Sequence, residues 1–251
     1  MDHKNYTCGI FIDLCKAFDT VDHEILLSKM YHYGIRGIVQ KLFKSYLTNR
    51  MQYVYINDHK SNLQTIKCGV PQGSVLGPLL FLLYINDIAN CCSNGMFRVF
   101  ADDTGIFIQG PEINTLIIKA KETMTNIDEW FSSNKLTLNI DKTCFIIFKH
   151  NRWLHQQIPD SISFSNKTIN RVKSVKYLGL LIDESLKWNY HVNEVCNSIK
   201  KLFPIFYNIR QYINLKHARS IYYSMIYSKV KYAIIAYGQT SQENINKIQI
   251  L

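Results

Sequence analysis

The sequence predicts an α+β fold. An antiparallel sheet with packed helices occupies residues 1–184, and an all-α region follows over residues 185–251. Three observations support this prediction. Short apolar runs occur in pairs joined by turn residues, as in antiparallel hairpins. Pro111 begins a long segment with apolar residues at helical spacing as far as Phe131. Strand-like patterns stop near residues 182–187, and only helical patterns follow.

Composition limits the classes of protein and partner. The formal net charge is +10, from 29 Lys and Arg against 19 Asp and Glu, which indicates a polyanionic partner: nucleic acid or an anionic membrane surface. The longest apolar run, Val75–Ile85, contains Gly77 and Pro78 and is too short to span a bilayer. The 7 cysteines form no C-x-x-C pair, which indicates free thiols in a reducing compartment. Without a signal-peptide core, we expect an intracellular protein, nuclear or cytoplasmic, that is not secreted.

The first element is a buried strand, Thr7–Leu14, that ends in a carboxylate at Asp13. Burying an unpaired carboxylate is costly, so Asp13 must lie at the sheet edge or meet a cation. Asp22 is a good N-cap for a helix that runs through Tyr33. A second amphipathic helix is predicted at Ile38–Leu47.

A hairpin and a shaped loop follow. Met51–Ile56 and Leu63–Cys68 predict two paired strands around a polar turn. Gly69–Ser74 contains two glycines and a proline, which predicts a tight loop whose final serine can cap a helix from about Leu79 to Ile88. An ordinary connector is one interpretation of this loop. Gln72, standing between small residues, could instead contact a ligand.

A pair of adjacent carboxylates lies between two further strand-like runs. Met96–Ala101 and Thr104–Gln109 flank Asp102 and Asp103, which predicts a hairpin with a negatively charged tip. Taken alone, such a turn is an ordinary surface feature. Together with Asp13, three carboxylates at two strand tips can hold two divalent cations roughly 3.5–4 Å apart. Hard oxygen ligands favour Mg²⁺ over zinc.

The next segments are less informative. Leu136–Asn139 and Thr143–Phe148 are strand-like, and Lys142 between them is most simply a solvated turn lysine. Asn151–Ser161 is polar and predicts a loop. Ser174–Ile182 predicts strand, turn and strand.

The last part of the chain is predicted to be helical. The expected helices are His191–Leu202, Ile205–Ile213 and Lys216–Tyr237. Over residues 185–232, eight Lys or Arg accompany one acid, Glu194, and aromatic residues are interleaved with them. Basic groups contact phosphates and aromatic faces stack on bases, so this region could bind nucleic acid. A helical bundle with a solvated basic face is the alternative.

Three motifs resemble one known family, in order and in spacing. Phe11–His23 resembles the first catalytic motif of reverse transcriptases from non-LTR (LINE-type, jockey-like) retrotransposons. Gly69–Pro78 resembles the second motif of that family. Phe100–Asp103 resembles its catalytic Asp-Asp hairpin, with Phe where many members have Tyr. The resemblance runs from about Thr7 to Gly238.

The resemblance implies a right-hand polymerase fold with a palm and a remnant of the fingers at 1–184 and a thumb at 185–251. It also implies an RNA-directed DNA polymerase that extends a primer 3′-hydroxyl on an RNA template with two Mg²⁺ ions. The implied metal ligands are Asp13, Asp102, Asp103 and the backbone carbonyl of Leu14. The implied partners are the RNA template, the DNA primer, dNTPs and, if they are expressed together, the endonuclease part of the polyprotein.

Further roles follow from the same resemblance. Phe18 would be the steric gate that packs under the deoxyribose and rejects a 2′-hydroxyl. Gln72, with Gly73 beside it, would contact the incoming nucleotide or the template base. Lys142 matches, more loosely, a lysine thought to protonate pyrophosphate. Tyr177–Gly179 would lie in the primer grip.

The chain also departs from the family pattern. Only about a dozen residues precede Asp13, so the basic residues of the fingers that clamp the triphosphate have no counterpart. The upstream endonuclease and a downstream Cys/His zinc knuckle are also missing, which predicts a fragment of a retrotransposon polyprotein. Two alternatives stay open: an inactive or domesticated nucleic-acid-binding fragment, and a different palm polymerase, such as a group II intron maturase or an RNA-dependent RNA polymerase. Phe18 disfavours an RNA-making enzyme.

Overall fold

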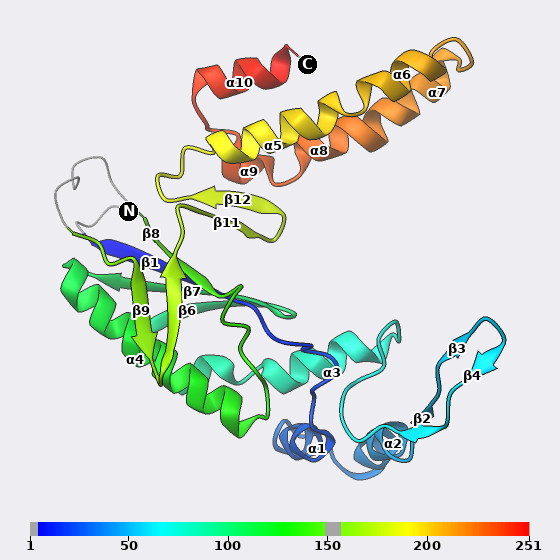
Figure 1. The fold of residues 1–251 in the computed structure, drawn as a ribbon, viewed down its shortest axis with the longest axis vertical. Helices are drawn as coiled ribbons and strands as arrows, with labels where there is room; N and C mark the ends of the chain where they lie inside the picture. The colour runs from blue at the N-terminus through cyan, green and yellow to red at the C-terminus, as the bar shows by residue number, and fades with distance from the viewer. Residues whose placement is uncertain (1–4, 149–156, 251) are drawn as a thin grey trace. The chain divides into compact units, whose positions relative to one another are not determined.

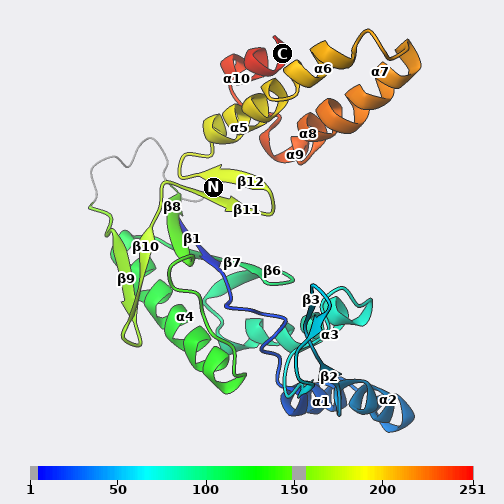
Figure 2. The same cartoon turned by 45° about the vertical axis from the view of Figure 1, so that its right-hand side comes forward.

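The computed structural model describes residues 5–148 and 157–250. Contacts divide the chain into two compact units: of the described residues, the first holds 5–147 and 157–171, and the second holds Phe148 and 172–250. The first unit carries the elements from β1 to β10, and the second carries those from β11 to α10 (Figures 1 and 2). In this grouping the hairpin β11–β12 belongs with the helices. The palm and thumb boundary between residues 184 and 185 stays a prediction.

A six-stranded sheet forms the centre of the first unit, in the order β6-β7-β1-β8-β10-β9. Its strands are β1 (Tyr6–Ile12), β6 (Gly95–Phe100), β7 (Asp103–Gly110), β8 (Cys144–Phe148), β9 (Ser161–Phe164) and β10 (Lys167–Arg171). β7 pairs antiparallel with both β1 and β6, and β10 pairs antiparallel with β9. β10 and β8 are parallel, so the sheet is mixed rather than wholly antiparallel. The hairpin β9–β10 was not predicted from the sequence.

The long helix α4 (Ile113–Ser133) covers one face of this sheet and packs against β1, β7 and β9 (Figure 1). Its predicted apolar stripe is confirmed, because Leu116, Ala120, Met124 and Ile127 are completely buried. β1 is buried along almost its whole length, as expected for a strand inside a sheet.

Four shorter helical segments complete the first unit. They are α1 (His23–His32), α2 (Gly37–Leu47), α3 (Leu76–Ile85) and the 3₁₀ turn η1 (Ile88–Cys91). Asp22 is the predicted N-cap of α1, since its Oδ1 accepts hydrogen bonds of 3.0 Å from the N–H groups of Glu24 and Ile25. The Ser74 hydroxyl accepts a 2.9 Å bond from the N–H of Gly77. This bond supports the start of α3 at Leu76, three residues earlier than expected.

The predicted hairpin between α2 and α3 is present, but its paired segments are short. β2 (Met51–Gln52) pairs with β5 (Gln64–Thr65), and β3 (Tyr55–Ile56) pairs with β4 (His59–Lys60). Asn57 and Asp58 form the turn with positive φ angles of 46° and 62°. Figure 1 shows the hairpin as a projection from the unit that contains the sheet.

The second unit combines a small hairpin with a set of helices. Its elements are β11 (Ser174–Tyr177), β12 (Leu180–Asp183), α5 (Asn189–Lys200), α6 (Phe203–Ile209), α7 (Leu215–Ile221), the π-helical segment η2 (Tyr222–Tyr227), α8 (Ser228–Lys231), α9 (Ile234–Tyr237) and α10 (Gln242–Gln249). The strand–turn–strand at 174–182 is confirmed. The single helix expected at Lys216–Tyr237 is wrong, because Ala233 takes a positive φ of 52° and separates α8 from α9.

Two other sequence predictions are corrected or lie outside the described chain. The strand expected at Leu136–Asn139 is reduced to a single bridge between Leu138 and Leu14. Residues 149–156, which include most of the predicted loop at Asn151–Ser161, lie outside the described residues.

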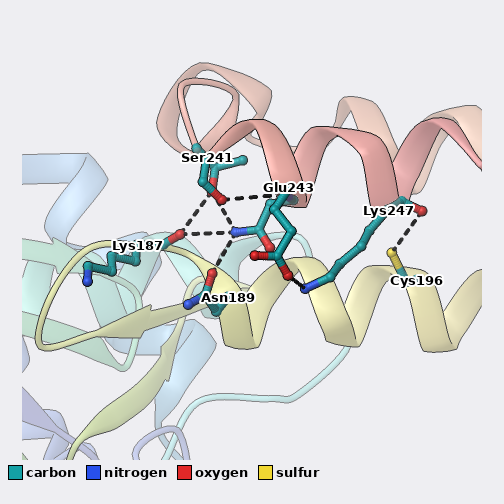
Figure 3. A network of polar contacts seen from close by, with 8 residues as sticks. Lys187, Asn189, Cys196, Ser241, Glu243 and Lys247 are labelled. Atoms are coloured by element: carbon teal, nitrogen blue, oxygen red, sulfur yellow. Dashed lines mark hydrogen bonds and ion pairs between the residues drawn. The ribbon is translucent and has the colours of Figure 1, made fainter.

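α10 is fixed to the start of α5 by one buried amide. Asn244 is fully buried, and its Nδ2 donates hydrogen bonds to Oδ1 of Asn189 at 2.7 Å, to Oγ1 of Thr240 at 2.8 Å and to the carbonyl of Lys187 at 3.3 Å. Figure 3 shows this network, together with the contact between Cys196 on α5 and the carbonyl of Lys247 on α10. The second unit therefore has polar as well as apolar packing.

Candidate active site

The Asp-Asp hairpin forms as predicted, with one correction to its turn. Phe100 pairs with Asp103, so the two-residue turn consists of Ala101 and Asp102, and Asp103 is the first residue of β7. Ala101 has a φ of 53°, because tight hairpin turns that match strand twist need positive φ angles. A non-glycine residue in this conformation is strained, and such strain tends to occur at functional positions.

The strand register brings Asp13 to the same end of the sheet. The ladder between β1 and β7 ends with Ile12 opposite Thr104, so the next position places Asp13 beside Asp103. Directly opposed residues of neighbouring strands have Cβ atoms about 4.5–5.5 Å apart, and like charges there repel. Burial, followed by the negative charges of Asp102 and Asp13, raises the pKa of Asp103 above its ordinary value. The three predicted carboxylates therefore interact electrostatically.

The cluster of Asp13, Asp102 and Asp103 does not enclose a metal site by itself. Within residues 5–148 and 157–250, no group of three or more His, Cys, Asp or Glu side chains is arranged to hold a metal ion on its own. Asp102 and Asp103 are both exposed, and Asp13 is half-buried. Further ligands would have to come from the backbone, from water or from a bound substrate.

Asp13 is fixed by the segment that leads into β8. Asn139 donates a 2.9 Å hydrogen bond from Nδ2 to Oδ2 of Asp13, and the backbone N–H of Asp13 donates to Oγ1 of Thr143 at 3.3 Å. The Lys142 ammonium lies 3.7 Å from the same Oδ2, with 70% of its side chain exposed. In the described chain these side-chain contacts all go to Oδ2, so Oδ1 is left to meet another ligand.

The backbone around Leu14 has a definite orientation. The carbonyl of Asp13 accepts a 3.0 Å bond from Asn139, and the N–H of Cys15 donates a 2.9 Å bond to Thr137. Backbone groups of successive residues in an extended chain point to opposite edges, and Asp13 and Cys15 both face residues 137–139. The carbonyl of Leu14 therefore points away from residues 137–139. β1 lies between β7 and β8 in the sheet, so this direction leads toward the β7 side.

Phe18 is fixed between α3 and the loop of residues 69–74. Its ring contacts that of Phe81 on α3, with centroids 4.8 Å apart and planes tilted by 34°. Its carbonyl accepts a 2.8 Å bond from the N–H of Val70, and the N–H of Gly69 donates a 2.7 Å bond to Val21. These backbone bonds fix the loop against the chain that leaves β1.

Only glycine fits at position 69, where the loop of residues 69–74 meets the chain that leaves β1. Gly69 has a φ of +88°, and a Cβ atom built at this position would lie 2.8 Å from the backbone oxygen of Asp19. The buried His23 lies behind it, with Nε2 at 2.7 Å from the carbonyl of Gly69. The sequence analysis missed this role of His23, and the roles of Asn139 and Thr143 beside Asp13, because no spacing signal marks contacts across such separations.

Gln72 and Gly73 lie on the exposed side of the loop. The amide nitrogen of Gln72 donates a 2.8 Å hydrogen bond to Oδ1 of Asp19, and both residues are exposed. Gly73 has a φ of +79° with open space around it. Phe18 thus lies against the loop that carries Gln72 and Gly73, and Lys142 lies beside the carboxylate cluster. In the part of the chain that the structure describes, no hydrogen bond or ion pair joins these two groups.

The residues predicted to lie in the primer grip, Tyr177–Gly179, are the end of β11 and the two-residue turn, Leu178 and Gly179, that leads into β12. Leu178 and Gly179 have φ angles of 47° and 76°, and the hydroxyl of Tyr232 donates a 2.7 Å bond to the carbonyl of Leu178. This bond anchors the turn to the end of α8.

The structure combines a sheet that has an acidic hairpin tip with a glycine-rich loop that lies beside an aromatic side chain. Polymerase palms share these two features, and comparison with known proteins indicates the same class. The family model described as reverse transcriptase (RNA-dependent DNA polymerase) matches residues 1–182. The chain belongs to the reverse transcriptase family. The family resemblance inferred from the three motifs is thereby confirmed.

Curated relatives come from mobile elements. The RNA-directed DNA polymerase from mobile element jockey of Drosophila melanogaster is 27% identical over 264 residues, which cover 100% of this chain and 28% of that protein. The probable RNA-directed DNA polymerase from transposon BS of the same species is also 27% identical, over 271 residues, with the same shares covered. The chain thus spans little more than a quarter of the length of these relatives.

The fold is also found in a solved structure. A telomerase from Candida albicans, in complex with a fragment of telomeric RNA, superposes with a TM-score of 0.51 at 13% identity. The match covers 97% of this chain and 46% of that one. The predicted α+β class with the right-hand polymerase fold is confirmed.

Proposed function

We propose that this chain is the catalytic portion of an RNA-directed DNA polymerase of the non-LTR retrotransposon type. It transfers deoxynucleotides to a primer 3′-hydroxyl on an RNA template. One observation carries the proposal: the register of β1 and β7 brings Asp13 to the Asp102–Asp103 hairpin in a member of the reverse transcriptase family. The proposed activity is the one for which the longer mobile-element relatives are named.

The carboxylate cluster fits Mg²⁺ in charge and in ligand chemistry. Burial and the negative charges of Asp102 and Asp13 raise the pKa of Asp103, and a divalent cation relieves that repulsion. Asp13, Asp102, Asp103 and the Leu14 carbonyl would hold two Mg²⁺ ions, which when bound supply activation of the 3′-hydroxyl and neutralisation of the leaving pyrophosphate. Oδ1 of Asp13 is the oxygen that its neighbours leave for this purpose.

The remaining residues bind and select the nucleotide. Phe18 acts as the steric gate, and its contact with Phe81 keeps the ring from yielding to a 2′-hydroxyl. Gln72 and Gly73 contact the nucleotide or the template base, with the Gln72 amide oriented by Asp19. Lys142, highly exposed beside Asp13, can deliver a proton to the leaving pyrophosphate.

The second unit supplies affinity for the template–primer duplex. Tyr207 and Tyr212 are 64% and 81% exposed, and the guanidinium of Arg210 lies 4.1 Å from the ring centroid of Tyr207. Such cationic and aromatic groups bind nucleic acid without regard to sequence. The partners are an RNA template, a DNA primer and dNTPs, with the endonuclease of the polyprotein where both are expressed, in the nucleus or cytoplasm. Along the described residues, no helix combines the length and apolarity needed to cross a bilayer.

The test is primer extension on an RNA template with Mg²⁺ and dNTPs. We expect incorporation by the wild type and its loss in Asp102→Ala. Glu129→Ala, which removes an exposed acid on α4, is the matched control and should keep full activity. Equal incorporation by the wild type and Asp102→Ala would contradict the proposal.

A second candidate is a nucleic-acid-binding protein without catalysis. This candidate is favoured by one observation: within the described residues, no three acidic, His or Cys side chains are arranged to hold a metal ion by themselves. Filter binding across a salt series separates the two functions. Binding that weakens steeply with salt, without any incorporation, supports the second candidate.

A further inference from the structure

The hairpin between α2 and α3 exposes almost every side chain it carries. We call residues 51–66 the arm. Six of its large apolar residues are between 51% and 63% exposed: Met51, Tyr53, Val54, Tyr55, Ile56 and Leu63. An exposed apolar surface of this extent on a soluble protein marks an interaction site. The arm packs so little against the rest of the unit that folding alone does not explain these residues.

The charge of the arm indicates the chemistry of its partner. The Lys60 ammonium lies 5.5 Å from the ring centroid of Tyr53 and 6.0 Å from that of Tyr55. Asp58, the acid in the turn, accepts a 2.7 Å hydrogen bond from the Tyr55 hydroxyl. A cation among flat aromatic faces suits a partner that offers phosphates and unstacked bases together. Single-stranded nucleic acid has both, whereas the bases of a duplex are stacked inside.

A groove continues from the base of the arm to the proposed nucleotide site. It has a volume of about 580 Å³, and its lining includes Arg50, Gln52, Lys67, Asp19 and Gln72. The Arg50 guanidinium lies 5.2 Å from the ring centroid of Tyr46. Because Arg50 lines the groove, its positive charge can attract a phosphate there.

We propose that the arm and this groove hold the single-stranded RNA template ahead of the position where it pairs with the incoming nucleotide. Bases stack on Tyr53 and Tyr55, Lys60 contacts a phosphate between them, and Arg50 and Lys67 contact the phosphates that lead to Gln72. This inference rests on the proposed polymerase function and adds the path of the unpaired template to it.

The test measures binding of the full chain to labelled RNA–DNA duplexes that have either blunt ends or a single-stranded RNA overhang on the template. For the wild type we expect affinity to rise with the overhang. The triple variant Tyr53→Ala/Tyr55→Ala/Lys60→Ala should lose roughly tenfold in affinity for the overhang substrate and bind the blunt duplex as before. These side chains are exposed, so the variant should fold normally.

The matched control is Tyr31→Ala/Arg36→Ala, which removes another exposed cation–aromatic pair, with the guanidinium 4.5 Å from the ring centroid, at the end of α1. It should keep the overhang effect. Arg50→Ala and Lys67→Ala should each lower the slope of log affinity against log salt by about 0.7. A wild type without any overhang effect, or an arm variant that keeps it, overturns the inference and assigns the apolar surface to another partner.

The outcome is separable from that of the proposed function. Asp102→Ala should lose incorporation and keep overhang-dependent binding. Asp102-dependent incorporation by a wild type that shows no overhang effect would count against the arm alone. Arm-dependent binding without any incorporation would count against the polymerase function alone.

Discussion

The side-chain amide of Gln72 donates a 2.8 Å hydrogen bond to the carboxylate of Asp19, 53 residues earlier in the chain. With its nitrogen committed to Asp19, the amide presents its carbonyl oxygen in a fixed direction. Asp19 therefore acts on the proposed nucleotide site through Gln72.

Replacing Asp19 with Ala should release the Gln72 amide. We expect KM for dNTPs to rise about 2- to 10-fold with little change in kcat, because one exposed hydrogen bond contributes about 0.5–1.5 kcal/mol. Steady-state primer extension measures this split. The control is Glu122→Ala, in which another exposed acid loses an amide partner, Asn94. A fall in kcat at unchanged KM would argue that Asp19 does not act by orienting Gln72.

Neutralising Asp103 should stabilise the protein while abolishing catalysis. Burial and the charges of Asp102 and Asp13 raise the pKa of Asp103, so its charged form is disfavoured in the folded state. The associated stability is complete below the ordinary value of 3.8 and is lost as pH rises through the raised pKa. Asp103→Asn should therefore increase the free energy of unfolding at pH 7, by well under about 1 kcal/mol because the group is exposed.

The gain should disappear near pH 3, where the wild-type carboxyl is itself protonated. Urea denaturation at both pH values measures it. A destabilised Asp103→Asn variant at neutral pH would show that the three carboxylates do not repel one another.

Gly69→Ala should destabilise the first unit by about 2 kcal/mol or more. The variant combines a disfavoured positive φ with a Cβ atom 2.8 Å from backbone that cannot easily shift. Gly73→Ala is the matched control, since Gly73 has a similar φ of +79° but open space, and it should cost about 1 kcal/mol. Urea denaturation compares the two, and equal losses would mean that the contact with Asp19 is relieved at no cost.

Removing the cap of α1 should have a pH-dependent effect. Burial raises the pKa of Asp22, but hydrogen bonds from Lys135 and from the N–H groups of Ile25 and Glu24 outweigh it, so the net pKa is lowered. The stability that Asp22 contributes is present above the ordinary pKa of 3.8 and is lost as pH falls through the lowered value. Asp22→Ala should cost about 1–2 kcal/mol at pH 7 and much less in acid.

Lys135→Ala separates the two contributions of Asp22. It removes only the 2.6 Å ion pair, whose lysine is 66% exposed, so it should cost less than about 1 kcal/mol. A loss as large as that of Asp22→Ala would show that the ion pair, rather than the cap, stabilises α1.

Phe18→Val should admit ribonucleotides in a chain that polymerises. The smaller side chain leaves room for a 2′-hydroxyl, while the Phe18 carbonyl keeps its bond to Val70. Competition between dNTPs and rNTPs in primer extension measures the change. Phe97→Val on the edge strand β6 is the control and should keep the wild-type preference, whereas unchanged selectivity in Phe18→Val would remove the gate role.

The elements that were predicted correctly are those specified by residues close together in the sequence. The Asp22 cap, the α4 stripe and the β6–β7 hairpin each depend on residues close together in the chain, whose side-chain types and spacing are visible in the sequence. The interruption at Ala233 between α8 and α9 could not be predicted from the sequence, because no glycine or proline marks that position. The hairpin β9–β10 was missed because its strands are only four and five residues long, although Ser165 and Asn166 are ordinary turn residues.

By itself the sequence determined the family, the three carboxylates and the loop that contains Gln72, because these depend on the identity and order of residues. Only the tertiary structure decided which side chains fix them. Asn139 reaches Asp13 across 126 positions, His23 reaches the carbonyl of Gly69 across 46, and Asp19 orients Gln72. Such contacts depend on strand register and on the packing of distant segments, and a pattern of neighbouring residues holds no information about either.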